Sequence, residues 1–306
     1  MRLVDLVILL AVGALWGASF LFMRQAAPVL GPVGTIEARV LLAGLALLAI
    51  AVMVRKVPDF RRDLSGFLIL GVLMAAAPFT LIAAAELKIT ASLAAILNAT
   101  TPLFALLVSA VWQHKRPHRR QLAGVALGLA GVAALVGLGP LEVDGTLLLA
   151  VAASLLAALF YALGGVYAKV RFPDTPPLVT ATGQQLGAAV CLLIPALAMP
   201  PRESVSGTVV LSVVALALGC TALGFVLFFR LVNSLGPTGA LTVTFLVPLF
   251  GVLWGTVFLS EPLTWSMPVG MAMVLGAVFF VTERRPSAAP ARTAQASTVA
   301  DGSAAG

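Results

Sequence analysis

Residues 4–23 read VDLVILLAVGALWGASFLFM, and the charged residue Asp5 interrupts this apolar stretch near its start. The hydrocarbon core of a bilayer is about 30 Å thick, and a helix of about 20 apolar residues crosses it. A cleaved signal peptide has a shorter apolar core of roughly 7–15 residues, followed by a cleavage site. The stretch therefore predicts a transmembrane helix that is retained in the mature protein.

The composition places the whole chain in a membrane. Hydrophobic residues make up 60% of the 306 residues and charged residues 10%, whereas soluble domains average about 45–50% apolar and about 25% charged residues. A soluble fold of this length could not cover so much apolar surface. The net charge of +7 would suit nucleic acid, but the basic residues stand in short clusters between apolar runs, where they set membrane topology. We therefore expect membrane lipid around the chain and no nucleic acid as a partner.

Further apolar runs predict an all-α membrane protein with ten transmembrane helices. The first five runs are Val4–Met23, Gly31–Val54, Gly66–Leu87, Ala91–Trp112 and Gln121–Leu138. The next five are Thr146–Ala168, Leu178–Met199, Val209–Leu231, Pro237–Leu259 and Met267–Val281.

The distribution of basic residues orients these helices. With the amino terminus in the cytoplasm, clusters such as Arg119-Arg120 fall on the cytoplasmic side. Of the 19 Lys and Arg, the opposite side receives Arg24, Lys88 and Arg202, and Arg39 falls within the second helix. The positive-inside rule then predicts a multi-pass protein of a bacterial-type inner membrane with both termini cytoplasmic, which requires an even number of helices.

The chain partly repeats itself. A shift of 145 residues lays Arg39 on Gln184, and a shift of 146 lays Pro102-Leu103-Phe104 on Pro248-Leu249-Phe250. Each half holds five predicted helices, and because five is an odd number the second half enters the membrane from the opposite side, as in many transporters. We expect a first five-helix repeat over 1–140, a second, inverted repeat over 141–285 and a disordered cytoplasmic tail over 286–306.

Two prolines mark polar positions near the middle of the membrane. Pro102 and Pro248 lie about eleven residues, or roughly 16 Å, into their predicted helices. A proline removes one backbone hydrogen bond and displaces the carbonyl four residues earlier, which here belongs to Asn98 and Thr244. We expect these kinked, polar positions to lie on a solute pathway; the alternative is a packing kink whose carbonyl is satisfied by a neighbouring helix.

Arg39 is the residue that costs most to insert, at about 2.5–3.5 kcal/mol near the centre of a helix. Glu37 points away from it, because two positions along a helix are about 200° apart. We expect Arg39 to face Thr35, another helix, water, or a ligand carboxylate or phosphate that suits its forked donors. A structural tether between helices is the alternative. Gln184 is its neutral counterpart in the second half.

Aromatic and hydroxyl side chains add to the predicted pathway. Trp16 and Ser19 lie on the first helix, and Tyr161 lies on the sixth. Such side chains can line a cavity for an amphipathic or aromatic solute, although core packing or lipid contact explains them as well.

Several chemistries are disfavoured by the sequence. It contains no Walker loop and no HExxH motif, and its two histidines, His114 and His118, fall in a basic loop. We expect no catalytic residue, no metal site and no cofactor. Glu37 leaves coupling to a proton or another ion open, and the small residues Gly124 and Gly128 leave a monomer or a homodimer open.

The order of several motifs points to a family. The first helix contains Leu15-Trp16-Gly17-Ala18-Ser19-Phe20, Arg39 follows Pro32 by seven residues, and Ser260-Glu261-Pro262-Leu263-Thr264 precedes Gly270. Together with the mid-helix prolines, these features resemble the EamA branch of the drug/metabolite transporter (DMT) superfamily over residues 4–283. The chain departs from that pattern at Lys115, where the first half of the family usually carries a glutamate.

The resemblance implies a basket-like bundle that works by alternating access and exports amino acids or other metabolites, often aromatic or amphipathic ones. It also implies a central cavity lined by the first, fourth, sixth and ninth helices. We therefore expect a secondary transporter that exports a small metabolite. The alternatives are a flippase for a lipid-linked intermediate on the same fold, or a membrane-embedded enzyme, which would need an acid–base pair. The predicted pathway residues are Trp16, Ser19, Arg39, Asn98, Pro102, Tyr161, Gln184, Thr244 and Pro248.

Overall fold

The structure of the chain, a computed structural model, describes residues 2–114, 116–139, 142–201 and 203–281, with the backbone alone at 237 and 238. The predicted tail, 286–306, lies outside the described residues. Within these ranges all the regular secondary structure is helical. The first half of the chain forms α1 (Leu3–Met53), α2 (Phe60–Gly71), the π-helical η1 (Val72–Ala76), α3 (Ala77–Ala85), α4 (Ala91–Asn98), α5 (Thr101–Trp112) and α6 (Arg119–Gly137). The second half forms α7 (Gly145–Arg171), α8 (Pro177–Ala198), α9 (Gly207–Val214), the π-helical η2 (Ala215–Leu223), α10 (Gly224–Ala240), α11 (Val243–Leu259) and α12 (Ser266–Val281).

The same Leu-Gly-Pro sequence interrupts both α1 and α10. Gly31 has φ +72° and ψ 159°, and Gly236 has φ +74° and ψ 168°, so the helical path breaks at each of them. Glycine adopts a positive φ without the steric cost that a Cβ brings. The proline that follows is suited to the first position of a new helix. The predicted boundaries at Gly31 and Pro237 coincide with these breaks, but the loop expected between Met23 and Gly31 is helical, because residues 24–30 contain no comparable interruption.

The lengths and composition of the helices fit a membrane. In the described part of the chain, seven helical segments are long and apolar enough to cross a bilayer, and α11 and α12 are shorter apolar helices. One of the seven is α1, whose 51 residues correspond to roughly 75 Å of helix, more than twice the thickness of a bilayer core. The chain is thus an all-helical membrane protein with several apolar spans.

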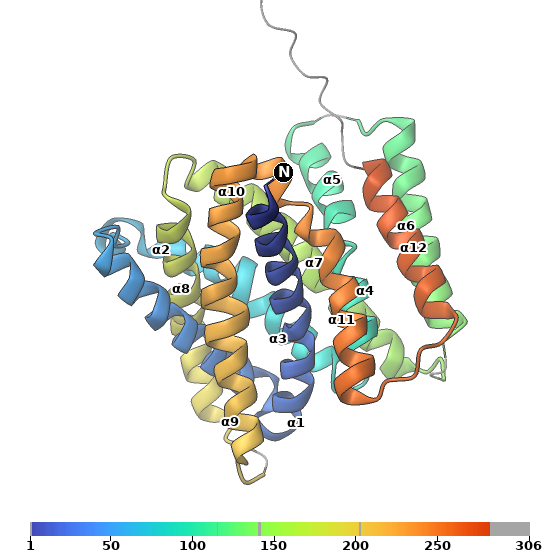
Figure 1. Cartoon of the computed structure of the whole chain (residues 1–306), viewed down its shortest axis with the longest axis horizontal. Helices are drawn as coiled ribbons and strands as arrows, with labels where there is room; N and C mark the ends of the chain where they lie inside the picture. The colour runs from blue at the N-terminus through green and yellow to red at the C-terminus, as the bar shows by residue number, and fades with distance from the viewer. Residues whose placement is uncertain (1, 115, 140–141, 202, 282–306) are drawn as a thin grey trace, which may run out of the picture.

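The first half of α1 runs through the middle of the bundle (Figure 1). It packs against α11 so closely that a Cβ on Gly17 would lie 2.7 Å from Phe250 Cβ. A Cβ on Gly251 would lie 2.4 Å from Ala95 Cβ, which brings α4 to the same seam. On one flank α6 and α12 lie side by side, and α1 begins at the end of the bundle where α12 finishes (Figure 1).

Candidate functional site

Arg39 is buried in the interior, 4% exposed, and its guanidinium contacts three other helical segments. Its Nε donates to Thr221 Oγ1 of η2 at 3.0 Å, and one terminal nitrogen lies 3.5 Å from Met23 Sδ of the first half of α1. The guanidinium carbon lies 3.6 Å from the centroid of the Phe79 ring of α3, which is a cation–π contact. Of the partners predicted for Arg39, which were Thr35, another helix, water or a ligand anion, the structure shows another helix.

The π-helical geometry of η2 positions Thr221. Its hydroxyl donates to the carbonyl oxygen of Leu216, five residues earlier, at 2.8 Å. Because the hydroxyl proton is used there, a lone pair on the oxygen accepts from Arg39. π-Helical turns of this kind are frequent at functional sites.

Aromatic and sulfur-containing neighbours complete the surroundings of Arg39. Tyr161 of α7 meets the Phe79 ring edge-on, with centroids 6.0 Å apart. Ser19 of α1 lies near the Cys220 thiol, and both Cys220 and Tyr161 lie within electrostatic range of the guanidinium. The structure thus brings together three of the predicted pathway residues, Ser19, Arg39 and Tyr161. We call the set Ser19, Arg39, Phe79, Tyr161, Cys220 and Thr221 the Arg39 cluster.

Among the described residues, no salt bridge neutralises the charge of Arg39. The ion pairs of the described residues are Arg2 with Asp5 and Arg171 with Asp63. Arg39 instead has a hydroxyl, a thioether and a ring face as its close partners. A guanidinium presents five N–H donors in a planar fork, which matches the two oxygens of a carboxylate. Its chemistry therefore suits an anionic group of a solute.

Two other predicted pathway residues have close contacts with residues outside this cluster. Trp16 packs on Phe228 and Phe225 of α10, with ring centroids 5.1 and 6.2 Å away. Gln184 is buried on α8, where its backbone carbonyl lies against Gly71 of α2. The sequence shift that pairs Gln184 with Arg39 therefore does not give the two residues the same surroundings.

The two prolines differ more than the repeat suggests. Before Pro102 the helix is interrupted at 99–100, and Pro102 is the second residue of α5. Pro248 is buried within the continuous helix α11. The carbonyl of Asn98, expected to be left open by the proline, accepts from Thr101 Oγ1 at 2.7 Å. The Thr244 hydroxyl likewise donates to a nearby backbone carbonyl, that of Leu241 in the turn before α11, at 2.7 Å.

Asn98 keeps one open acceptor. Its side-chain oxygen Oδ1 is buried and has no hydrogen-bond partner among the described residues. The unsatisfied polar group at this break is therefore the amide side chain and not the displaced carbonyl.

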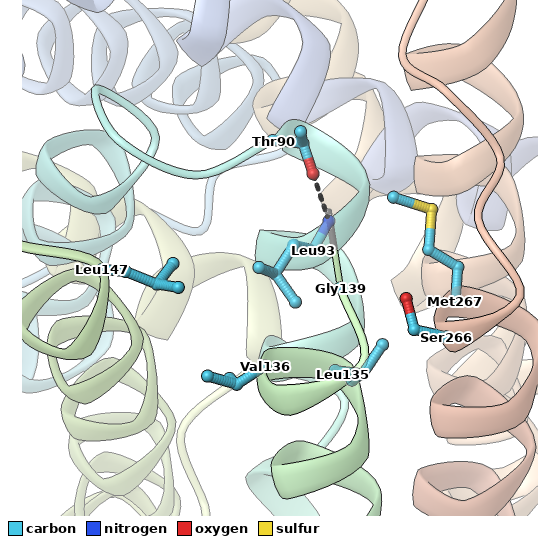
Figure 2. A pocket seen from close by; sticks show the side chains of 8 residues that line it. All are labelled: Thr90, Leu93, Leu135, Val136, Gly139, Leu147, Ser266 and Met267. Carbon is cyan, nitrogen blue, oxygen red and sulfur yellow. Dashed lines mark hydrogen bonds between the residues drawn. The ribbon is translucent and has the colours of Figure 1, made fainter. Parts of the chain in front are cut away.

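Two cavities lie elsewhere in the bundle. One of about 20 Å³ is enclosed by side chains of α4, α6, α7 and α12 (Figure 2), and it holds about one water molecule. A larger one, of about 260 Å³, lies at the Gly31 break beside Met199 and Pro200. None of the nine predicted pathway residues lines either of them.

Sequence reasoning missed several buried polar groups. Glu86, near the end of the predicted helix Gly66–Leu87, is 0% exposed, and neither carboxyl oxygen has a hydrogen-bond partner in the described chain. Gln185 is also buried, and neither polar atom of its side chain has a partner among the described residues. The sequence shows Glu86 only at the end of an apolar run, which does not distinguish a helix end at the surface from one covered by neighbouring helices.

Polar contacts join the two sequence halves at both ends of the bundle. The Glu261 carboxylate accepts from the backbone N–H groups of Ala91 and Ser92, at 2.7 and 3.0 Å, and from the Ser92 hydroxyl at 2.5 Å. It thereby caps the N-terminus of α4, where a negative charge is favoured. The second polar contact between the halves joins α7 to α2, where Arg171 at the end of α7 donates to the Asp63 carboxylate at 2.6 Å.

Comparisons with known proteins agree with this architecture. A solved structure described as "Crystal structure of protein" matches with a TM-score of 0.62 at 19% identity, covering 92% of this chain and 97% of its own. The inner membrane transporter YedA of Escherichia coli, described as uncharacterized, is 28% identical over 282 residues, which cover 90% of this chain and 89% of the relative. Protein PecM of Dickeya dadantii is 25% identical over 273 residues, 88% and 89% of the two chains. The EamA-like transporter family matches residues 4–137 and again 148–283. Because these two matches span most of the sequence, the chain belongs to the EamA-like transporter family.

Proposed function

We propose that this membrane transporter exports a small amino acid-like or amphipathic, aromatic metabolite across the inner membrane by alternating access. Membership of a transporter family, and not of an enzyme family, sets the class of activity. The observation that carries the solute proposal is the Arg39 cluster, a cation with polar and aromatic neighbours buried in a bundle of apolar helices.

The proposed topology has ten spans in two inverted halves, with both termini in the cytoplasm. The breaks at Gly31 and Gly236 support it, because each divides a helix at a predicted boundary. The separate family matches to residues 4–137 and 148–283 support two related halves. The basic clusters support the cytoplasmic placement of the termini.

The chemistry of the Arg39 cluster indicates the solute class. Arg39 supplies a fork of donors for a carboxylate, while Phe79 and Tyr161 offer ring faces and edges to an apolar or aromatic side chain. Ser19 and Thr221 add hydroxyl groups. A small molecule with one carboxylate and one apolar end matches this combination.

Alternating access requires contacts that break in turn on the two sides. In the proposed topology, Asp63 and Arg171 meet on the cytoplasmic side, and Glu261 meets the N-terminus of α4 on the outer side. Each contact joins one half to the other, so opening either side separates residues of different halves.

The test is solute counterflow in liposomes that contain the purified protein. The probes are radiolabelled phenylalanine, tryptophan, leucine, threonine and lysine, each tested in exchange for the same unlabelled compound inside. The proposal predicts saturable uptake of at least one carboxylate-bearing aromatic or aliphatic compound, and none in protein-free liposomes. Absence of saturable exchange for the whole panel, together with movement of a fluorescent phospholipid between leaflets, would replace the proposal with a lipid flippase.

A further inference from the structure

Glu86 is a buried acid without a hydrogen-bond donor. It ends α3, directly before the connection to α4, and its side chain is 0% exposed. Its backbone carbonyl accepts from the Arg24 guanidinium, but neither carboxyl oxygen has a hydrogen-bond partner among the described residues. A backbone capping role therefore does not explain the carboxyl group itself.

An ionised carboxylate is strongly disfavoured in such a place. Removing it from water costs a large free energy, and a buried acid whose oxygens accept no hydrogen bond takes up a proton instead. In the arrangement seen here Glu86 is therefore a carboxylic acid, with the proton on one of its two oxygens.

The charged groups that face Glu86 come from two parts of the fold. Arg24 and Arg39 of α1 lie within electrostatic range and favour the ionised form, and Glu261, between α11 and α12, lies within range and disfavours it. Glu261 is held near Glu86 by its hydrogen bonds to the N-terminus of α4. The charge balance at Glu86 therefore depends on a contact between the two halves that changes when the outer side opens.

We propose that Glu86 binds the proton whose inward movement drives export, an inference that rests on the proposed transport function. A proton from water on the outer side forms the O–H bond at a carboxyl oxygen while that side is open. Closure returns Glu261 to α4 and buries the acid. When the inner side opens, the O–H bond breaks and the proton passes to water on that side, while the two arginines stabilise the carboxylate.

Glu37 provides a matched comparison. Glu37, on α1, is likewise a buried glutamate, and neither of its carboxyl oxygens has a hydrogen-bond partner among the described residues. Arg24, Arg39 and Glu261 influence the ionisation of the Glu86 carboxyl group, whereas burial is the one influence on that of Glu37 among the described residues. Glu37 is therefore a buried acid that the helix contacts between the halves do not influence.

The first experiment needs no substrate. Infrared spectra of reconstituted protein at neutral pH should contain a carbonyl band of protonated carboxylic acid that decreases in Glu86→Gln. The exposed control Glu142→Gln should leave the band unchanged, and Glu37→Gln serves to subtract the contribution of the second buried acid. A band that is identical in wild type and Glu86→Gln overturns the inference.

The second experiment uses the labelled amino acid with the highest saturable exchange in the panel above. With one proton exchanged per solute, a pH gradient of one unit supports about tenfold accumulation. Wild type and Glu142→Gln should approach that ratio, Glu86→Gln should show none, and Glu86→Asp, which restores an acid, should recover part of it. Gel filtration checks that each variant is folded. Equal accumulation by wild type and Glu86→Gln overturns the inference, whereas absence of exchange in wild type overturns the transport proposal instead.

Discussion

Arg39 and Thr221 are separated by 182 positions in the sequence, yet Arg39 Nε donates to the hydroxyl of Thr221 at 3.0 Å inside the bundle. The two residues come from different sequence halves, and both are buried. A buried charge with a specific partner on another helix is the usual sign of a functional position in a membrane protein. The contact therefore links the packing of the two halves to the group that we expect to hold the solute.

The first prediction concerns this contact. Thr221→Val keeps the shape of the side chain but removes the acceptor for Arg39. A hydrogen bond to a charged group contributes about 1.5–3 kcal/mol, so we expect a loss of stability in that range in thermal unfolding of the detergent-solubilised protein. Thr256→Val is the control, because the Thr256 hydroxyl donates within its own helix to Val252. Equal stability of the two variants would mean that the Arg39 contact contributes nothing.

The second prediction concerns the cap on α4. In Glu261→Gln the amide NH₂ replaces one accepting oxygen and faces the N–H groups of Ala91 and Ser92. An unsatisfied buried donor costs about 1–3 kcal/mol. We therefore expect faster hydrogen exchange at the amides of residues 91–93. The exposed control Glu203→Gln should not alter exchange there, and unchanged exchange in Glu261→Gln would refute the capping role.

The third prediction concerns the seam between α1 and α11. A Cβ on Gly17 would lie 2.8 Å from the backbone nitrogen of Gly251, which cannot move aside easily. Overpacking of this kind typically costs about 1–3 kcal/mol, so Gly17→Ala should lower the thermal midpoint. Gly165→Ala meets nothing within 4 Å and should instead raise stability by up to about 1 kcal/mol through helix propensity. The same shift for both variants would contradict the packing argument.

The fourth prediction is a pH dependence outside the membrane. Hydrogen bonds from the Leu147 N–H, at 2.7 Å, and from the Thr146 hydroxyl lower the pKa of Asp144 below its ordinary value. A depressed folded-state pKa gives stabilisation that is complete above the unfolded pKa of about 3.9 and is lost as the pH falls through the folded value. The protection factor of the Leu147 amide should therefore be constant at neutral pH and fall below about pH 4.

Asp144→Asn is the control for this prediction, since it retains an accepting oxygen that does not titrate. Its Leu147 protection should not change over the same acidic range. A decline of the same size in both proteins would assign the effect to another group.

Much of the fold is predictable because lipid imposes a simple rule on sequence. Apolar runs of sufficient length appear as helices, and the glycine-proline pairs at Gly31 and Gly236 mark the breaks, because a positive φ followed by proline cannot continue a helix. The same signal does not predict that the helix breaks at 99–100, before Pro102, but continues around Pro248. Proline restricts the local backbone in both, and the packing of neighbouring helices decides how far the helix opens.

The candidate site was predictable in part. The insertion cost of Arg39 identified it without a structure, but its partners Thr221 and Phe79 depend on contacts between distant helices that periodicity does not reveal. The burial of Glu86 is hidden from the sequence for the same reason. Its position at the end of a helix is visible in the sequence, whereas its complete burial results from the helices packed around it.

The most direct test of the account is amino acid counterflow by Arg39 variants in liposomes, with Arg62→Gln, at an exposed position, as the matched control. Arg39→Gln should lose saturable exchange while it still elutes as folded protein, Arg39→Lys should retain a small part of it because it keeps the charge without the fork, and Arg62→Gln should equal wild type. Exchange by Arg39→Gln with the same rate and half-saturation as wild type would contradict the assignment of the solute to this cluster.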